Sequence, residues 1–173
     1  EIKECDWSSD VCSSDLYTNN STTQANTAYS VLLLNGTSGS IIDQTRTVDL
    51  ESFGAVKVVN GFSPYSANNY SVYLNGSSDL TLPSSANYQG GTIFTIEMWA
   101  WLPAPSSGAQ LLACVPVSGA WQVQLNSGYI NLGIYGVINA LTSGTLMPAG
   151  QWVHVVVVRS GTGTNQTSIF QNG

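Results

Sequence analysis

Charged side chains are scarce in this sequence. Lys, Arg, Asp and Glu together make up 8% of the 173 residues, and only one histidine is present. An average soluble protein carries about 25% charged residues. The four basic residues are too few to neutralise a run of phosphates, so the composition argues against a nucleic-acid partner. Hydrophobic residues still reach 43%, which indicates a folded chain whose surface is polar but uncharged.

Long apolar runs and helical periodicity are missing as well. The apolar segments are all much shorter than the roughly 18 residues that a membrane-spanning helix needs, so no membrane span is expected. We find no stretch with the 3.6-residue apolar period of an amphipathic helix. The length is that of one domain.

The first sixteen residues differ in composition from the rest. They carry five of the ten acidic residues and two of the three cysteines. The segment DWSSDVCSSDL matches the translation of a widely used sequencing-library adapter, so we interpret residues 1–16 as a non-native artefact. The native start of the chain is then expected to be missing. Residues 17–30 are polar and low in complexity, which is typical of a linker.

The native portion is close to neutral and nearly free of cysteine. From Tyr17 onward, three basic and five acidic residues leave a net charge of −2, and Cys114 is the remaining cysteine. One thiol cannot form an intramolecular disulfide, so no disulfide framework is expected.

Short apolar segments separated by turn residues recur through residues 31–173. Asn-Gly pairs at Asn35, Asn60, Asn75 and Asn172 predict turns at the ends of four of these segments. Such spacing predicts an all-β sandwich. We expect strands at 31–34, 41–43, 55–59, 71–74, 80–82, 92–102, 111–117, 121–125, 129–135, 153–158 and 168–170.

In the longest expected strand, a period of two sorts the side chains onto two faces. Glu97, Trp99 and Trp101 share one face, which is expected to be half-exposed or to meet another layer. The other face is purely apolar and is predicted to lie in the core; it consists of Phe94, Ile96, Met98 and Ala100. In the valine-rich strand 153–158 both faces are largely apolar, which is typical of a central strand.

An ordered set of motifs resembles laminin G-like domains of the concanavalin A-like lectin superfamily. The motifs are SVYLNGSSDLTLP, FTIEMWAWL, YINLGIYG, PAGQWVHVVVVRSG and IFQNG, and the resemblance covers residues 31–173. It implies a two-sheet antiparallel jelly-roll sandwich. It also implies a further pair of strands after the last motif, so the domain is expected to be truncated at its C-terminus.

Residues suited to catalysis are few. Glycosidases on this kind of sandwich use carboxylate pairs placed close together on one strand. Glu97 is the single acid on the long strand, and a partner would have to come from Asp43, Asp49, Glu51 or Asp79 in turns and loops. The sole histidine, His154, lies mid-strand among valines and resembles the family's structural histidine; we expect it to pair with Glu97 across neighbouring strands, keeping both satisfied when buried. No enzymatic activity is therefore expected.

Two kinds of binding site are considered. Exposed aromatic rings stack on the apolar faces of sugars, and the candidates are Trp99, Trp101 and Tyr135, although the two tryptophans could equally be core residues. Many domains of this fold hold calcium with loop carboxylates and carbonyls. The candidate metal ligands are Asp43 with Asn35 and Asp79 with Asn75, and the alternative for both acids is loop capping.

The sequence is therefore predicted to be a non-catalytic recognition or adhesion module that binds a glycan or a host cell-surface component. It resembles lectin-like modules of phage tail and other virion structural proteins, so a virion or extracellular location is expected, with any homo-oligomer formed through the parent protein. Two alternatives stay open, namely an accessory module of a secreted or cell-surface bacterial protein or hydrolase, and a ligand-free structural spacer. A solvent-facing tryptophan pair or an ordered calcium favours binding, whereas two fully buried tryptophans favour the spacer.

Overall fold

The computed structural model describes residues 30–45, 49–83, 85–88, 92–105, 108–114, 120–134, 138–163 and 165–173, with the backbone alone for 138–140. Contacts divide the chain into two units, Glu1–Ser30 and Val31–Gly173, and the second carries every element discussed below. The predicted artefact at 1–16 and nearly all of the predicted linker at 17–30 lie outside the described residues.

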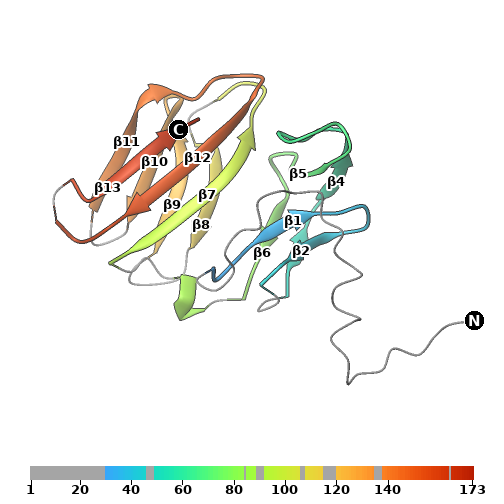
Figure 1. Ribbon diagram of the computed structural model, residues 1–173, viewed down its shortest axis with the longest axis horizontal. Helices are drawn as coiled ribbons and strands as arrows, with labels where there is room; N and C mark the ends of the chain where they lie inside the picture. Colours follow the sequence, from blue (N-terminus) through green and yellow to red (C-terminus); the bar gives the residue numbers. More distant parts are fainter. Residues whose placement is uncertain are drawn as a thin grey trace, which may run out of the picture. The chain divides into compact units, whose positions relative to one another are not determined.

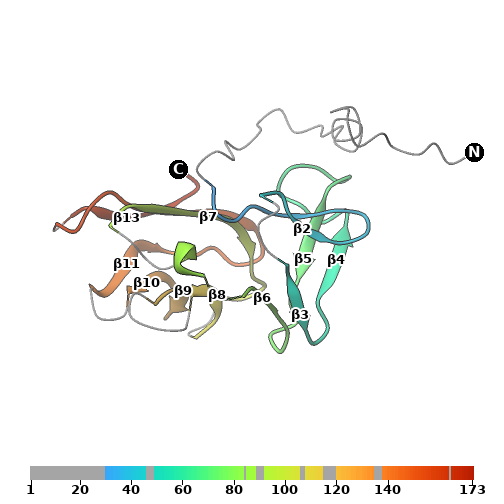
Figure 2. The ribbon, with the colours of Figure 1, turned by 90° about the horizontal axis from the view of Figure 1, so that it is seen from below.

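Two antiparallel sheets form the centre of this unit. The first has the order β13-β12-β7 and consists of β7 (Phe94–Trp101), β12 (Trp152–Arg159) and β13 (Thr167–Gln171). The second has the order β11-β10-β9-β8 and consists of β8 (Gln110–Cys114), β9 (Trp121–Asn126), β10 (Tyr129–Ile134) and β11 (Ile138–Leu146). Figure 1 shows the strands, and Figure 2 shows the two sheets as separate layers. The prediction of an all-β antiparallel sandwich is confirmed.

The core lies between the two sheets. Val153, Val155 and Val157 of β12 are fully buried, and Ile96 of β7 is 8% exposed. Phe94, Met98 and Ala100 pack against this core, so the predicted inward face of the long strand is correct. The facing sheet contributes Val123, Leu125, Ile130, Leu132 and Ile134. Because β-branched residues suit a pleated surface covered on both faces, the valine-rich segment occupies the central strand β12.

The second sheet depends on a tight hairpin and on one buried hydroxyl. Asn126 pairs with Tyr129 in the β9–β10 register, so the loop is Ser127-Gly128, and both residues have positive φ, 51° and 83°. That is the two-residue loop that matches strand twist. The edge strand β11 was not predicted, because its segment INALTSGTL lacks apolar alternation. Its buried Ser143 hydroxyl accepts a hydrogen bond from Ile130 N at 3.0 Å and donates one to Thr145 O at 2.8 Å.

Six short strands between Leu34 and Thr81 form three two-stranded ribbons. These pair β1 (Leu34–Gly36) with β2 (Ile41–Asp43), β3 (Glu51–Phe53) with β6 (Asp79–Thr81), and β4 (Lys57–Asn60) with β5 (Tyr70–Tyr73). The strand β3 was not predicted from the sequence. The short 3-10 helix η2 (Ala86–Tyr88) follows, and Tyr88 O accepts a 2.6 Å hydrogen bond from the Trp121 indole.

One predicted turn is wrong. Asn35-Gly36 lies within β1, and the chain reverses at Thr37–Ser40 instead. The Thr37 side chain explains the shift, because its hydroxyl donates to Ser40 O at 3.0 Å and accepts from Ser40 N at 3.3 Å. The predicted turns at Asn60 and Asn75 are confirmed by positive φ at Gly61 and Gly76. Asn172 also has a positive φ, but its N–H donates to His154 O at 2.9 Å beside β12, and the turn predicted there stays a prediction. Within the described ranges, the structure holds no helix with the length and hydrophobicity of a membrane crossing.

Candidate functional site

The outer face of the β13-β12-β7 sheet gathers large rings. Strand alternation that sends Ile96 and Val155 into the core sends Trp99, Trp101 and His154 to the opposite face. The antiparallel register places Trp101 opposite Trp152 and Trp99 opposite His154. Directly opposed side chains are the closest neighbours across a sheet, so two cross-strand ring pairs lie next to each other.

The loop between β4 and β5, residues 61–69, brings two more rings to this face. The Phe62 ring lies 5.2 Å from that of Trp101 and 5.3 Å from that of Trp152, centroid to centroid. The Tyr65 ring lies 5.8 Å from Trp99 at an interplanar angle of 72°. The β4–β5 ribbon stands beside the end of β7 (Figure 1). The outer surface of this sheet together with the loop rings is called the aromatic face. It consists of Phe62, Tyr65, Glu97, Trp99, Trp101, Trp152 and His154.

Local hydrogen bonds shape the 61–69 loop. Gly61 adopts a φ of +78°, which glycine tolerates, and its N–H donates to Asn69 O at 3.1 Å, closing the loop. Asn69 N in turn donates to Ser66 O at 3.2 Å. Tyr65 N donates to the Ser63 hydroxyl at 3.2 Å, and this local turn hydrogen bond restrains the backbone at Tyr65. The short polar residues of the loop GFSPYSANN therefore help to hold its two aromatic residues, Phe62 and Tyr65, in place.

Glu97 and His154 form the expected cross-strand pair. The imidazole donates from Nε2 to Glu97 Oε1 across 2.8 Å, which confirms the pairing. The expected burial is wrong, because the Glu97 side chain is 62% exposed and that of His154 is 25% exposed. The imidazole also stacks on Trp99, with centroids 4.8 Å apart and an interplanar angle of 27°. His154 thus connects the carboxylate to the tryptophan ring.

Exposure differs among the predicted ligand-binding residues. Trp99 is 37% exposed and its neighbour Tyr65 is 71% exposed. Trp101 lies on the same strand face but is half-buried beneath Phe62. Tyr135 lies outside the described residues. Phe62 is also 41% exposed, but its ring packs against both Trp101 and Trp152. Of the two predicted tryptophans Trp99 is the more exposed, and we call Trp99 and its neighbour Tyr65 the aromatic corner.

The two predicted calcium ligands lie in different settings. Asp43 is 5% exposed, and its carboxylate accepts from Leu33 N and Thr45 N, both at 3.0 Å, and from the Thr45 hydroxyl at 2.6 Å. This bonding is the loop-capping alternative. Asp79 begins β6, is exposed, and lies opposite Phe53. Among the described residues, no three His, Cys, Asp or Glu side chains gather as a metal site, and calcium binding stays a prediction.

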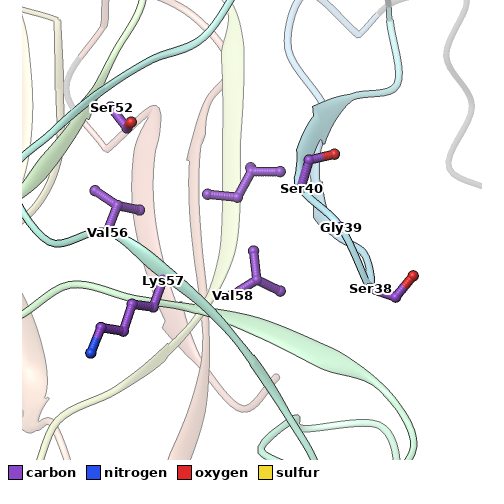
Figure 3. A pocket seen from close by; sticks show the side chains of 8 residues that line it. Ser38, Gly39, Ser40, Ser52, Val56, Lys57 and Val58 are labelled. Carbon is purple, nitrogen blue, oxygen red and sulfur yellow. The ribbon is translucent and has the colours of Figure 1, made fainter.

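A separate, open groove of about 550 Å³ is shared by the β1–β2 ribbon and the segment 52–58 (Figure 3). The Ser38 and Ser40 hydroxyls point away from the valines that line it, and the Lys57 ammonium also points away. Convergent polar groups are what fix a ligand in a pocket, so this groove is a weaker candidate than the aromatic face. It is lined by Ser38, Gly39, Ser40, Ile41, Ser52, Val56, Lys57 and Val58.

Reasoning from the sequence missed Phe62 and Tyr65. The available signal was two aromatic residues inside a segment otherwise made of Gly, Ser, Pro, Ala and Asn. Aromatic side chains in an exposed turn need a surface to cover or a ligand to contact. That signal shows that the rings have a role, but the partners Trp99, Trp101 and Trp152 come only from the fold.

Comparison with known families agrees with this geometry. A laminin G family model, described as the concanavalin A-like lectin/glucanases superfamily, matches residues 74–173. That range holds all the described strands of the two sheets, β7 to β13, including Glu97, Trp99 and His154. No curated protein and no solved structure matches the chain. The match covers more than half of the sequence, and the chain belongs to the concanavalin A-like lectin/glucanases superfamily through a laminin G-like domain.

Proposed function

We propose that this domain is a non-catalytic recognition module that binds carbohydrate at the aromatic corner. The observation that carries the proposal is the exposure of Trp99 and Tyr65, at 37% and 71%, on a rigid sheet and a hydrogen-bonded loop. Rings held in place lose little conformational entropy when a ligand covers them. The superfamily match supports a binding module in general.

The angle between the two rings limits the kind of carbohydrate. At 72° the rings of Tyr65 and Trp99 are far from coplanar, so they do not form one flat platform for a crystalline polysaccharide surface. A corner instead offers one ring to the apolar face of a single sugar and the other to its edge. The geometry therefore favours a soluble or cell-surface glycan, bound through one or two sugar units.

The carboxylates support binding rather than hydrolysis. Glu97 is the single acid in β7, β12 and β13, and its hydrogen-bonded neighbour is His154. Glycoside hydrolysis ordinarily needs two carboxyl groups flanking the bond. The proposed role of Glu97 is to accept hydrogen bonds from sugar hydroxyls.

The proposed setting is a virion tail or another extracellular protein, where the module attaches to glycans of a host surface. The scarcity of charge and the turn-rich polar surface support it. The accessory module of a secreted hydrolase shares the same binding role. The ligand-free spacer is disfavoured by the exposure of Trp99, because a ring with only a structural role gains most from full burial.

Glycan-array screening followed by calorimetric titration tests the proposal. Tyr65→Ala and Trp99→Ala should each weaken binding of the best array ligand by about tenfold or more, since aromatic anchors contribute at least about 1–2 kcal/mol. Phe53→Ala is the matched control, because Phe53 is as exposed as Tyr65, at 71%, and lies on β3. Repeating the titration with EDTA tests the predicted calcium at Asp43 or Asp79. If neither Tyr65→Ala nor Trp99→Ala changes the affinity for the best array ligand, the proposed site is wrong.

A further inference from the structure

Glu97 gives the aromatic corner an acidic neighbour. Glu97 sends a largely exposed carboxylate from the sheet beside Trp99, and its Oε1 is tied to His154, which stacks on the Trp99 ring. With the imidazole neutral, the pair carries one negative charge. Glu97 and Trp99 stand two residues apart on the same face of β7, so a sugar seated against Trp99 and Tyr65 lies beside this carboxylate.

Basic side chains stand elsewhere in the part of the chain that the structure describes. Arg159 alternates with the outward-facing residues of β12 and is 2% exposed, and its Nε donates to Gly161 O at 3.0 Å. Lys57 begins β4, whereas the loop that carries Tyr65 follows the other end of that strand. Lys57 lines the separate groove (Figure 3). Neither cation is placed to neutralise an anionic ligand at the corner.

We infer that the aromatic corner selects neutral glycans and discriminates against sugars that carry carboxylate or sulfate groups. This inference rests on the proposed carbohydrate-binding function and adds the ligand's charge class. A carboxylate accepts strong, charge-assisted hydrogen bonds from the hydroxyls of a neutral sugar. The same carboxylate repels an anionic sugar, and juxtaposed like charges are an efficient means of rejecting a wrong partner. The two exposed rings supply affinity that does not depend on charge.

Matched polysaccharides test the selectivity. The probes are soluble β-glucan, galactan and mannan, each compared with the same polymer after its C6 hydroxyls have been oxidised to carboxylates. Binding is measured by titration at pH 8, in 20 mM and in 500 mM NaCl. At low salt the neutral form of the bound polymer should bind about fourfold or more tightly than its oxidised form. High salt should reduce that ratio, because salt screens exposed charges.

Glu97→Gln identifies the group responsible. This substitution keeps an acceptor for the His154 imidazole and removes the charge, so it should raise affinity for the oxidised polymer and bring the two forms within about twofold. Glu51→Gln, which neutralises an exposed acid on β3, is the control and should leave the ratio unchanged. Circular dichroism checks that both variants fold.

The possible outcomes distinguish the preference for neutral glycans from carbohydrate binding itself. Oxidised polymers that bind the wild-type domain as tightly as the neutral ones, in a manner abolished by Trp99→Ala, would overturn the selectivity while leaving carbohydrate binding at the corner intact. An unchanged ratio in Glu97→Gln also overturns it. Failure of all six polymers and of the glycan array to bind would overturn the proposed function itself.

Discussion

Replacing Phe62 with alanine tests whether ring packing holds the 61–69 loop on the sheet. Phe62 is 41% exposed, so somewhat more than half of its surface is covered, about 120 Å² of a side chain that buries about 200 Å² in full. At about 25 cal/mol per Å² this burial contributes about 3 kcal/mol, an upper value because unfolded chains are partly compact. The ring contacts with Trp101 and Trp152 add about 1 kcal/mol. We expect Phe62→Ala to lower the free energy of unfolding by about 3 kcal/mol.

Phe53→Ala supplies the comparison. Phe53 is 71% exposed, so the same burial calculation gives about 1.5 kcal/mol, with no added ring contacts. Urea denaturation followed by tryptophan fluorescence measures both variants, and the emission reports on the site because Trp101 and Trp152 lie beneath Phe62. Phe62→Ala should also reduce glycan affinity, since Tyr65 loses its anchor. A difference in stability of less than about 0.5 kcal/mol between the two variants would refute the reasoning.

Two further predictions concern polar groups of the second sheet, the Ser143 hydroxyl and the Cys114 thiol. Ser143→Ala should lower the free energy of unfolding by about 1–3 kcal/mol, because Ile130 N–H loses its acceptor. The control Ser168→Ala on β13 should change the free energy of unfolding by less than about 0.5 kcal/mol. Equal losses of the two variants in urea denaturation would count against the role of Ser143. Burial raises the pKa of the Cys114 thiol. In a chain carrying Cys5→Ser and Cys12→Ser, Cys114 should therefore react with a disulfide reagent at pH 8 more slowly than free glutathione, and stability should decrease as the pH rises through the raised pKa. A reaction as fast as that of glutathione in the folded chain would contradict this.

Strongly patterned segments of the fold could be predicted from the sequence. The alternation of FTIEMWAW assigns both faces of β7, and the valines of β12 identify a central strand. The pairing of Glu97 with His154 also follows from one acid and one histidine on neighbouring expected strands. In these segments, local preference and long-range packing favour the same structure.

Where that agreement is absent, the sequence was a poor guide. The strand β11 is recruited by pairing with β10 and by the Ser143 hydroxyl, neither of which leaves an apolar pattern. The exposed strand β3, with the sequence ESF, has no buried face that could show a period. Asn35-Gly36 is a favourable turn sequence, but the turn forms at Thr37–Ser40 because side-chain hydrogen bonds stabilise it there. The aromatic corner depends on contacts between residues more than thirty positions apart, which only the tertiary structure supplies.

The two residues of the aromatic corner lie on either side of the start of the superfamily match. Trp99 lies in the segment that matches the superfamily, residues 74–173, whereas Tyr65 and its anchor Phe62 lie before that segment begins. A domain boundary drawn at residue 74 would therefore keep every strand of the two sheets and discard half of the proposed binding surface. Proteins that share this core need not share its ligand, because an alternative β4–β5 loop could set another ring, or none, against the same tryptophan.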